Sequence, residues 1–188
     1  MKENILQAIR VTLITVLFFS GVYTLVILGI AQLFPNHGKG DLIIAQGKTY
    51  YRNIGQKFTD DKYFWSRPSA VDYNAAGSCG SNKGPSNPDY LATVQARIDS
   101  FLVHNPTIHK SEVPAELVTA SGSGLDPDIS VKAALVQVNR IAAVRNISAE
   151  AIKKIIQETE EGPWLGIAGP EKVNVLQLNI ALEQNSLK

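Results

Sequence analysis

The longest apolar stretch of the chain runs from Val11 to Phe34, and no residue between Arg10 and His37 carries a formal charge. Roughly 20 apolar residues in a helix cross a hydrocarbon core about 30 Å thick. A buried helix of a soluble domain, the alternative, usually has a polar stripe, and no signal-peptide cleavage site follows the stretch. The pattern predicts a short tail over residues 1–10, one transmembrane helix over residues 11–34 and one soluble domain over residues 35–188.

Small and hydroxyl-bearing residues gather on one side of the predicted transmembrane helix. At 100° per residue, four of them fall within about one third of the circumference, namely Ser20, Gly21, Thr24 and Ala31. Membrane helices associate through such residues because small side chains let two backbones approach closely. We therefore expect this face to pack against a partner helix. The alternative is a lone anchor whose hydroxyls bond to their own backbone carbonyls.

The basic residues that flank the predicted span nearly balance. Lys2 and Arg10 precede it, whereas Lys39, Lys48 and Arg52 follow it. The positive-inside rule compares Lys and Arg near the two ends of a span. Charge alone therefore leaves the orientation open.

The residues after the span combine short strand-like and longer helix-like patterns. Residues 42–45 and 49–54, on either side of a turn glycine, predict a β-hairpin close to the membrane, and residues 117–119 predict a short strand. Periodic apolar positions and capping residues predict three helices, over residues 88–104, 131–145 and 149–159. Residues 173–182 fit a strand or a final helix, and we favour the helix. The predicted fold class is a single N-terminal transmembrane helix followed by one mixed α+β domain.

Two loops rich in Gly, Ser and Asn cover residues 58–88 and 120–128. Irregular loops longer than about 12–15 residues are usually functional or disordered, and the aromatic residues of the first loop argue against disorder. These aromatic residues either pack inside the domain, contact another chain or lie at the membrane interface. The candidates for partner contact are Tyr63, Phe64, Trp65, Arg67, Tyr73, Asn74, Ser78, Ser81 and Asn82 in the first loop, and Ser121, Ser123 and Asp126 in the second.

Composition and motif spacing argue against several classes of site. A formal net charge of +1 disfavours a nucleic-acid partner, and one cysteine with three histidines offers little for a metal site. Residues 77–84 lack the residue order of a phosphate loop, and neither Ser121 nor Ser123 lies in a G-x-S-x-G motif. A membrane-tethered serine hydrolase using Ser121 or Ser123 and a direct ATP-binding module stay as alternatives to a non-catalytic role.

The chain closely resembles the KdpC subunit of the bacterial Kdp potassium-transporting P-type ATPase. The resemblance covers nearly the whole chain and rests on the N-terminal span followed by FTDDKYFWSRPSAVDYNAAGSCGSNKGPSN, VPAELVTASGSGLDPDIS, QVNRIAAVR and LGIAGPEKVNVLQLNIAL. It implies a single-pass protein of the bacterial inner membrane whose soluble domain lies on the periplasmic side. The implied partners are a channel-like potassium-binding subunit, an ATP-hydrolysing pump subunit, a small peptide subunit and the lipid bilayer.

The same resemblance implies a non-catalytic accessory subunit that is needed for assembly. The family is described as a catalytic chaperone that raises the ATP affinity of the pump subunit, in a complex that uses ATP, magnesium and potassium. It implies no cofactor bound by this chain itself. Because a periplasmic domain cannot meet cytoplasmic ATP, we expect any effect on nucleotide affinity to pass through subunit contacts as a coupling free energy.

Overall fold

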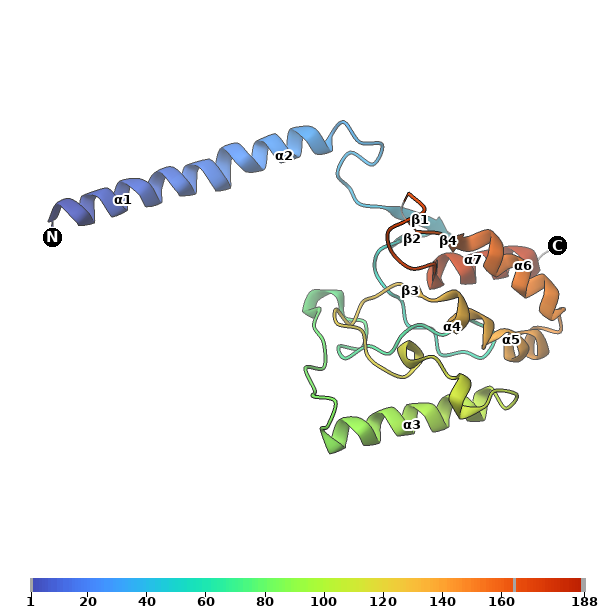
Figure 1. Ribbon diagram of the computed structural model, residues 1–188. Helices are drawn as coiled ribbons and strands as arrows, with labels where there is room; N and C mark the ends of the chain where they lie inside the picture. Colours follow the sequence, from blue (N-terminus) through green and yellow to red (C-terminus); the bar gives the residue numbers. More distant parts are fainter. Residues whose placement is uncertain (1, 164, 187–188) are drawn as a thin grey trace. The chain divides into compact units, whose positions relative to one another are not determined.

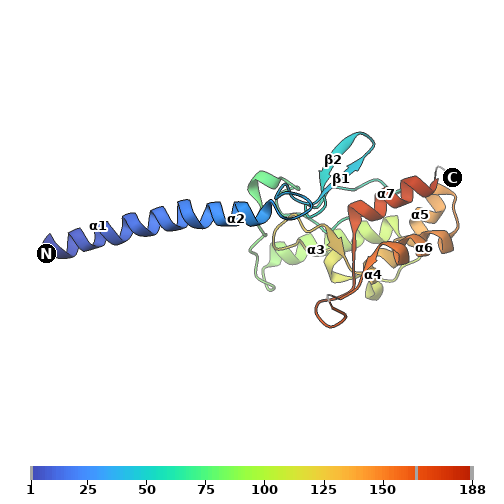
Figure 2. The same cartoon turned by 90° about the horizontal axis from the view of Figure 1, so that it is seen from above.

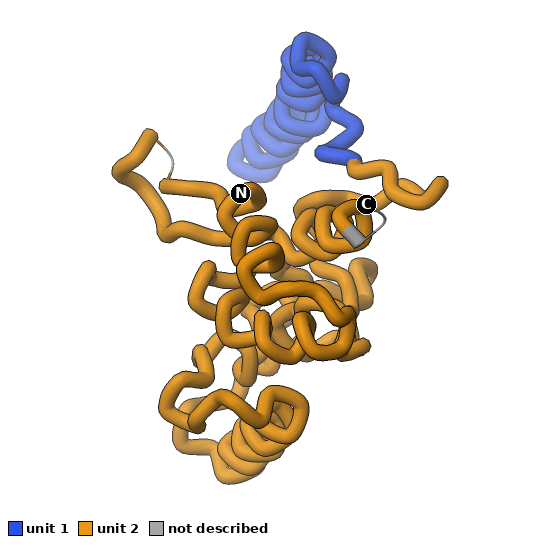
Figure 3. Tube along the Cα trace, turned by 90° about the vertical axis from the view of Figure 1, so that its right-hand side faces the viewer, with its two compact units in different colours: residues 1–42 blue, residues 43–188 orange. Residues whose placement is uncertain are grey.

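The computed structural model describes residues 2–163 and 165–186 of the chain. It divides into two compact units, residues 1–42 (unit 1) and residues 43–188 (unit 2), which Figure 3 colours separately. The buried core cluster and the residues packed against it lie between Phe58 and Leu182. Unit 2 therefore has a hydrophobic core of its own.

Unit 1 is built around one long helix with three successive segments (Figure 1). They are α1 (Lys2–Val16), the π-helical segment η1 (Leu17–Tyr23) and α2 (Thr24–Ala31). By length and composition, residues Glu3–Ala31 can cross a membrane, and none of the most apolar part is buried in the structure. The helix includes residues 2–10, which we expected to form a tail, and it ends at Ala31 rather than Phe34.

The π-helical segment changes the geometry of the predicted packing face. A π-helix closes its hydrogen bonds from residue i to i+5, so residues across it no longer follow the 100° spacing of an α-helix. Ser20 and Gly21 lie inside this segment, Thr24 follows it directly, and Ala31 lies a further two turns along α2. The Thr24 hydroxyl donates to the Phe19 carbonyl at 3.1 Å. The assumption of an uninterrupted α-helix was therefore wrong, and the position of Ala31 relative to the other three residues changes with it.

Within its described residues, unit 2 combines five α-helices and three 3-10 turns with two small sheets, as the predicted mixed class requires. Its strands are β1 (Leu42–Ala45, whose first residue closes unit 1), β2 (Lys48–Tyr51), β3 (Asp128–Ile129), β4 (Glu160–Glu161) and β5 (Lys172–Asn174). Its α-helices are α3 (Pro88–His104), α4 (Val131–Leu135), α5 (Val138–Arg145), α6 (Ala149–Thr159) and α7 (Val175–Ser186). Short 3-10 turns are η2 (Ala75–Gly77), η3 (Lys110–Glu112) and η4 (Ala115–Leu117).

The hairpin β1–β2, helix α3 and helix α6 confirm the predicted elements, whereas three others differ. The predicted strand over residues 117–119 is wrong, because η4 occupies its beginning. The predicted helix over residues 131–145 breaks into α4 and α5 at Val136 and Gln137. Residues 172–182 contain both alternatives, because strand β5 runs directly into helix α7.

The second sheet has the strand order β3-β5-β4, and both of its pairs are antiparallel. In the register, Asp128 faces Asn174, and Glu161 faces Lys172. The Asn174 side chain then accepts a hydrogen bond from the Gln177 backbone at 3.1 Å. A side-chain acceptor at this position is the usual helix N-cap interaction, which explains how a strand can pass into α7 without a loop.

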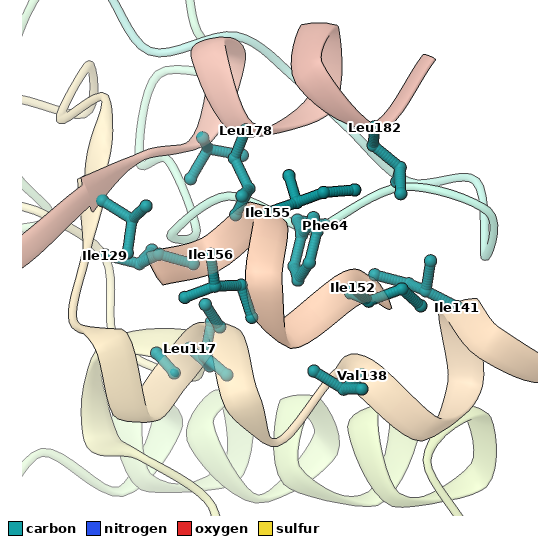
Figure 4. Packing of buried hydrophobic residues seen from close by; sticks show 14 of the residues in the cluster. Phe64, Leu117, Ile129, Val138, Ile141, Ile152, Ile155, Ile156, Leu178 and Leu182 are labelled. Atoms are coloured by element: carbon teal, nitrogen blue, oxygen red, sulfur yellow. The ribbon is translucent and has the colours of Figure 1, made fainter. Parts of the chain in front are cut away.

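Helices α5, α6 and α7 pack their apolar faces around one aromatic residue, Phe64 (Figure 4). Phe64 has no exposed surface, and it comes from the long loop rather than from a helix or strand. The residues around it include Val138, Ile141, Ile152, Ile155, Ile156, Leu178 and Leu182. On α6 the isoleucines recur at the helical spacing that sequence analysis uses to predict a buried face.

A buried amide on α7 pairs with both backbone groups of Phe64. The Phe64 N–H donates to Asn179 Oδ1 at 2.8 Å, and Asn179 Nδ2 donates to the Phe64 carbonyl at 3.0 Å. Asn179 is 3% exposed. Buried backbone polar groups need such partners, because a burial without a hydrogen bond costs about 1–3 kcal/mol per group. The amide therefore fixes the aromatic loop in the core.

We expect Asn179→Ala to lower the free energy of unfolding by about 2–4 kcal/mol, because it leaves the buried N–H and carbonyl of Phe64 unpaired. Urea unfolding of the full chain in detergent, followed by near-UV circular dichroism, measures the change. The matched control is Asn185→Ala on the same helix, where the side chain is exposed and donates to the Ala181 carbonyl. Equal stability of the two variants would contradict this role of Asn179.

Candidate partner-contact surface

The aromatic loop divides between packing inside the domain and exposure at its surface. Phe64 is fully buried in the core, so it belongs to the intradomain alternative and is unavailable as a contact residue in this structure. Tyr63 and Trp65, its neighbours, are half-buried. The membrane-interface alternative for these aromatic residues is not needed to explain their positions, because each one contacts side chains of unit 2.

Arg140 of α5 binds the backbone of the aromatic loop. Its guanidinium donates to the carbonyls of Asp61 and Tyr63 at 2.5 and 3.1 Å, and it lies 4.6 Å from the centre of the Trp65 ring. Gln137 Oε1 accepts from both the Trp65 N–H at 2.8 Å and the Arg140 guanidinium at 2.7 Å. Burial lowers the pKa of Arg140 to about 10, so the side chain keeps its charge at neutral pH. At the break before α5, Gln137 Nε2 donates to the Ala133 carbonyl at 3.0 Å, whereas the Gln137 N–H donates to the Ala134 carbonyl at 3.1 Å.

Three contacts join the two Gly/Ser-rich loops, which are far apart in the sequence. The Ser121 N–H donates to the Pro68 carbonyl at 3.2 Å, and the Ser78 hydroxyl donates to the Ser123 carbonyl at 2.9 Å. Arg67 forms a salt bridge with Asp126 at 2.7 Å. We call this joined surface, residues 66–84 with residues 119–126, the loop seam. The structure thus brings together candidates that the sequence could only place in separate loops.

Glycines allow the two loops to approach so closely. Gly124 has φ +68°, and a Cβ added there would lie 2.7 Å from Val71 Cγ2 and 2.9 Å from the Cys79 carbonyl. An added Cβ at Gly80 would lie 2.9 Å from the Gly122 carbonyl. Such distances are too short for any larger side chain. Gly124 also needs the left-handed backbone that glycine adopts without steric cost.

The candidate residues differ in how far the seam exposes them. Asn74, Ser78, Ser81, Asn82 and Ser123 are exposed. Half-buried candidates are Arg67, Tyr73 and Asp126. Ser121 is buried, at 3% exposure, so it holds the seam together rather than facing outward. The exposed candidates are therefore the ones that can meet another protein.

Tyr73 forms hydrogen bonds within the first loop of the loop seam. Its hydroxyl donates to the Arg67 carbonyl at 2.5 Å, and its N–H donates to the Ser69 hydroxyl at 2.9 Å. Burial raises the pKa of Tyr73 to about 12, which keeps the phenol protonated and able to donate at all physiological pH values. Tyr73 has φ +60°, a conformation that is unusual for a bulky residue and that these hydrogen bonds hold in place.

A hollow of about 400 Å³ lies beside the seam and includes residues that the sequence analysis missed. Ser81, Lys83, Asp89 and Arg97 contribute to its lining. Arg97 Nη1 donates to the Val118 carbonyl at 3.2 Å, which ties α3 to the segment before the second loop. Lys83 and Arg97 come from a loop and a helix, so no local motif could have paired them.

The geometry does not favour a serine nucleophile at the seam. The ring nitrogens of His37 and His104 bond to the Gln32 carbonyl and to Asp61, and the His109 side chain caps η3. The Ser123 hydroxyl accepts from the Leu125 N–H at 3.1 Å. A serine hydrolase needs a base within hydrogen-bond reach of the nucleophile, and these histidines are engaged elsewhere. Among the described residues, no group of three or more His, Cys, Asp and Glu is placed to hold a metal ion.

We expect Gly124→Ala to lower the free energy of unfolding by about 2–4 kcal/mol, because it adds both a left-handed strain and an overlap with Val71 and Cys79. Thermal unfolding of the full chain in detergent measures the loss. Gly84→Ala is the control, since a Cβ there meets no atom within 4 Å. If Gly124→Ala were as stable as Gly84→Ala, the close approach of the two loops would be refuted.

Comparison with known proteins places these features in a family. A family model described as the c chain of K+-transporting ATPase, KdpC, matches residues 5–184. The potassium-transporting ATPase KdpC subunit of Flavobacterium psychrophilum is 54% identical over 183 residues, which cover 97% of this chain and 98% of the relative. The KdpC subunits of Bacteroides fragilis and Caldanaerobacter subterraneus subsp. tengcongensis are 50% and 46% identical, each over 97% of this chain, and the alignments cover 97% and 95% of these relatives. The chain therefore belongs to the KdpC family, the c chains of potassium-transporting ATPases.

Proposed function

We propose that the chain is a non-catalytic accessory subunit that assembles a potassium-uptake complex and raises the ATP affinity of its pump subunit. Family membership makes the chain a component of a potassium-transporting ATPase. The observation that carries the proposal is the loop seam, in which hydrogen bonds, a salt bridge and closely packed glycines join two loops and leave polar residues exposed on the outside. This arrangement suits recognition of another protein rather than chemistry.

The long helix of unit 1 acts in this proposal as a single membrane span that packs on a partner helix. Gly21 supports this role, because a Cβ built there meets only Leu17 Cδ1, at 3.9 Å, within this chain. The surface at Gly21 is therefore open to close approach by another helix. Its position in a π-helical segment adds support, since such segments are frequent at functional sites.

The exposed residues of the loop seam face the outer surface of the channel-like subunit and cover the entrance for potassium. Asn74, Ser78 and Asn82 offer hydrogen bonds there without a net charge that would repel a cation. This assignment places unit 2 on the extracytoplasmic side of a bacterial inner membrane. The pump subunit and the small peptide subunit complete the set of protein partners.

The effect on ATP affinity is indirect in this scheme. Because unit 2 lies outside the cell, it influences the nucleotide site only by stabilising one state of the assembled complex. Such coupling between distant sites is typically worth about 1–3 kcal/mol, which corresponds to roughly 5–150-fold in affinity. ATP, magnesium and potassium are then used by the complex, and this chain binds none of them itself.

We expect Gly21→Leu to reduce co-purification of the partner subunits about tenfold, because the larger side chain keeps the partner helix from approaching the backbone. A Cβ at position 21 lies 3.9 Å from Leu17 Cδ1, an ordinary contact distance in this chain, so we attribute the loss to the partner. Gly29→Leu is the matched control, since Gly29 follows Thr24 by five residues and lies about 140° around α2 from it. Full complex yield with Gly21→Leu would remove this face from the proposal.

Cys79 can report the side of the membrane on which unit 2 lies. It is the single cysteine of the chain, and it is exposed. We expect a membrane-impermeant maleimide to label Cys79 in intact cells. Asn4→Cys in a Cys79→Ser background should react only after the cells are permeabilised. The reverse pattern of labelling would place unit 2 in the cytoplasm and contradict the indirect effect on ATP affinity.

A further inference from the structure

An apolar loop between β4 and β5 projects from unit 2 at a place remote from the loop seam in the sequence. Figures 2 and 3 show that the connection between these strands extends away from the body of the unit. Ile167 is 88% exposed, the largest exposed fraction among the large apolar residues that the structure describes, and Leu165 is 73% exposed. We call residues 165–169 the apolar tip.

The residues of the apolar tip are open to solvent. A Cβ added at Gly166 or at Gly169 meets no atom within 4 Å, and residues 165–169 are all exposed. No residue from 162 to 170 carries a charge. Two large apolar side chains with most of their surface exposed gain little stabilisation, since the favourable term for apolar surface is its removal from water.

The backbone of the apolar tip is strained at Leu165. The Gly166 N–H donates to the Pro163 carbonyl at 2.9 Å, which closes a tight turn. Leu165 has φ +54° in that turn, a position that glycine or asparagine normally takes. Strained residues that serve no internal packing cluster at ligand clamps and binding sites. Leu165 is 73% exposed in this turn, so its side chain is accessible to another molecule.

The base of the loop is firmly held. Glu161 pairs with Arg52, which directly follows β2, and Lys172 Nζ lies 2.5 Å from Asp128 Oδ2 and 3.7 Å from Glu161 Oε2. The next residue along β5, Val173, is fully buried in the core. A loop on a fixed base needs less ordering when it binds, which lowers the entropic cost of association.

The charges at the base of the loop favour a protein pocket over an anionic lipid surface as the binding partner of the apolar tip. Carboxylates outnumber the cations there: Glu160, Glu161, Glu171 and Asp128 against Arg52 and Lys172. Segments that insert into bacterial-type anionic bilayers carry Lys and Arg beside their apolar side chains. An acidic base would instead be repelled by anionic lipid, and it complements a rim of basic side chains.

We propose that the apolar tip inserts Leu165 and Ile167 into an apolar pocket with a basic rim on another subunit of the potassium-transporting ATPase. The contact rests on the proposed function, because it requires that the chain assembles with such subunits. It is a second contact, separate from the loop seam and from the membrane helix. Its role is to hold unit 2 in one orientation, since a tethered domain with a single contact could still rotate about it.

The test uses the full chain co-expressed with its partner subunits and compares association after detergent extraction at increasing dilution. We expect Leu165→Ser with Ile167→Ser to weaken association at least about tenfold, because two apolar side chains remain in water. The unfolding midpoint of the unassembled variant should stay that of the wild type. Val103→Ser is the control, since Val103 is 77% exposed on α3. Association equal to that of the wild type would overturn the proposal.

A charge reversal and an accessibility measurement keep the proposal testable if the double variant unfolds. Glu171→Lys should weaken association too, because it opposes a basic rim. Ile167→Cys in a Cys79→Ser background should react with a water-soluble maleimide about tenfold more slowly after assembly than before it. Equal reaction rates, or unchanged association of Glu171→Lys, would overturn the basic-rimmed pocket.

Proteoliposomes distinguish the bilayer from the partner subunit. The same cysteine, labelled with bimane, is placed in vesicles of equal parts phosphatidylcholine and phosphatidylglycerol that contain nitroxide-labelled acyl chains. Quenching by these lipids, in the presence and absence of partner subunits, would assign the apolar tip to the bilayer and overturn the proposal. If the wild-type chain itself fails to co-purify with the partner subunits, the proposed function fails. If the wild-type chain and the tip variants associate equally well, only the inference about the apolar tip fails.

Discussion

Hydrogen bonds from three buried side chains to the backbone of the aromatic loop are the interactions on which the rest of unit 2 depends. Residues 61–65 form no helix or strand there, yet their peptide groups lie against the core. Buried peptide groups need hydrogen-bond partners. Arg140 and Gln137 from the start of α5 and Asn179 from α7 supply them. Removing one of these side chains would leave the backbone groups that it binds without their partners.

This network explains how a long loop without α-helix or strand can present a defined surface. Once Phe64 is fixed among α5, α6 and α7, the next residues lead into the loop seam, where Arg67 meets Asp126 and Gly124 meets Val71. The loop seam and the apolar tip therefore rest on elements with a common core. Surfaces that are ordered before binding lose less conformational entropy on association, which suits the contact role that we propose for this subunit.

The sequence predicted the elements that depend on local periodicity or capping. The hairpin, α3 and α6 follow from alternating residues, from the Asn87 cap and from the isoleucines of α6. It failed where a distant contact decides the structure. Gln137 turns inward to bond with Trp65, which breaks the helix predicted over residues 131–145, and Asn174 both ends β5 and caps α7. The loop candidates could be named from composition, but their joining could not, because Ser78 and Ser123 are far apart in the chain. For the same reason Phe64 was counted among the contact candidates although it lies in the core.

Hydrogen exchange of the backbone amides in the unassembled chain and in the assembled complex tests the central claim most directly. The loop seam is a contact surface in this account, so assembly should slow exchange in residues 66–84 and 119–126. The exposed face of α6 should exchange equally in both states. Unchanged exchange throughout the loop seam, in a complex that otherwise assembles and transports potassium, would contradict the account.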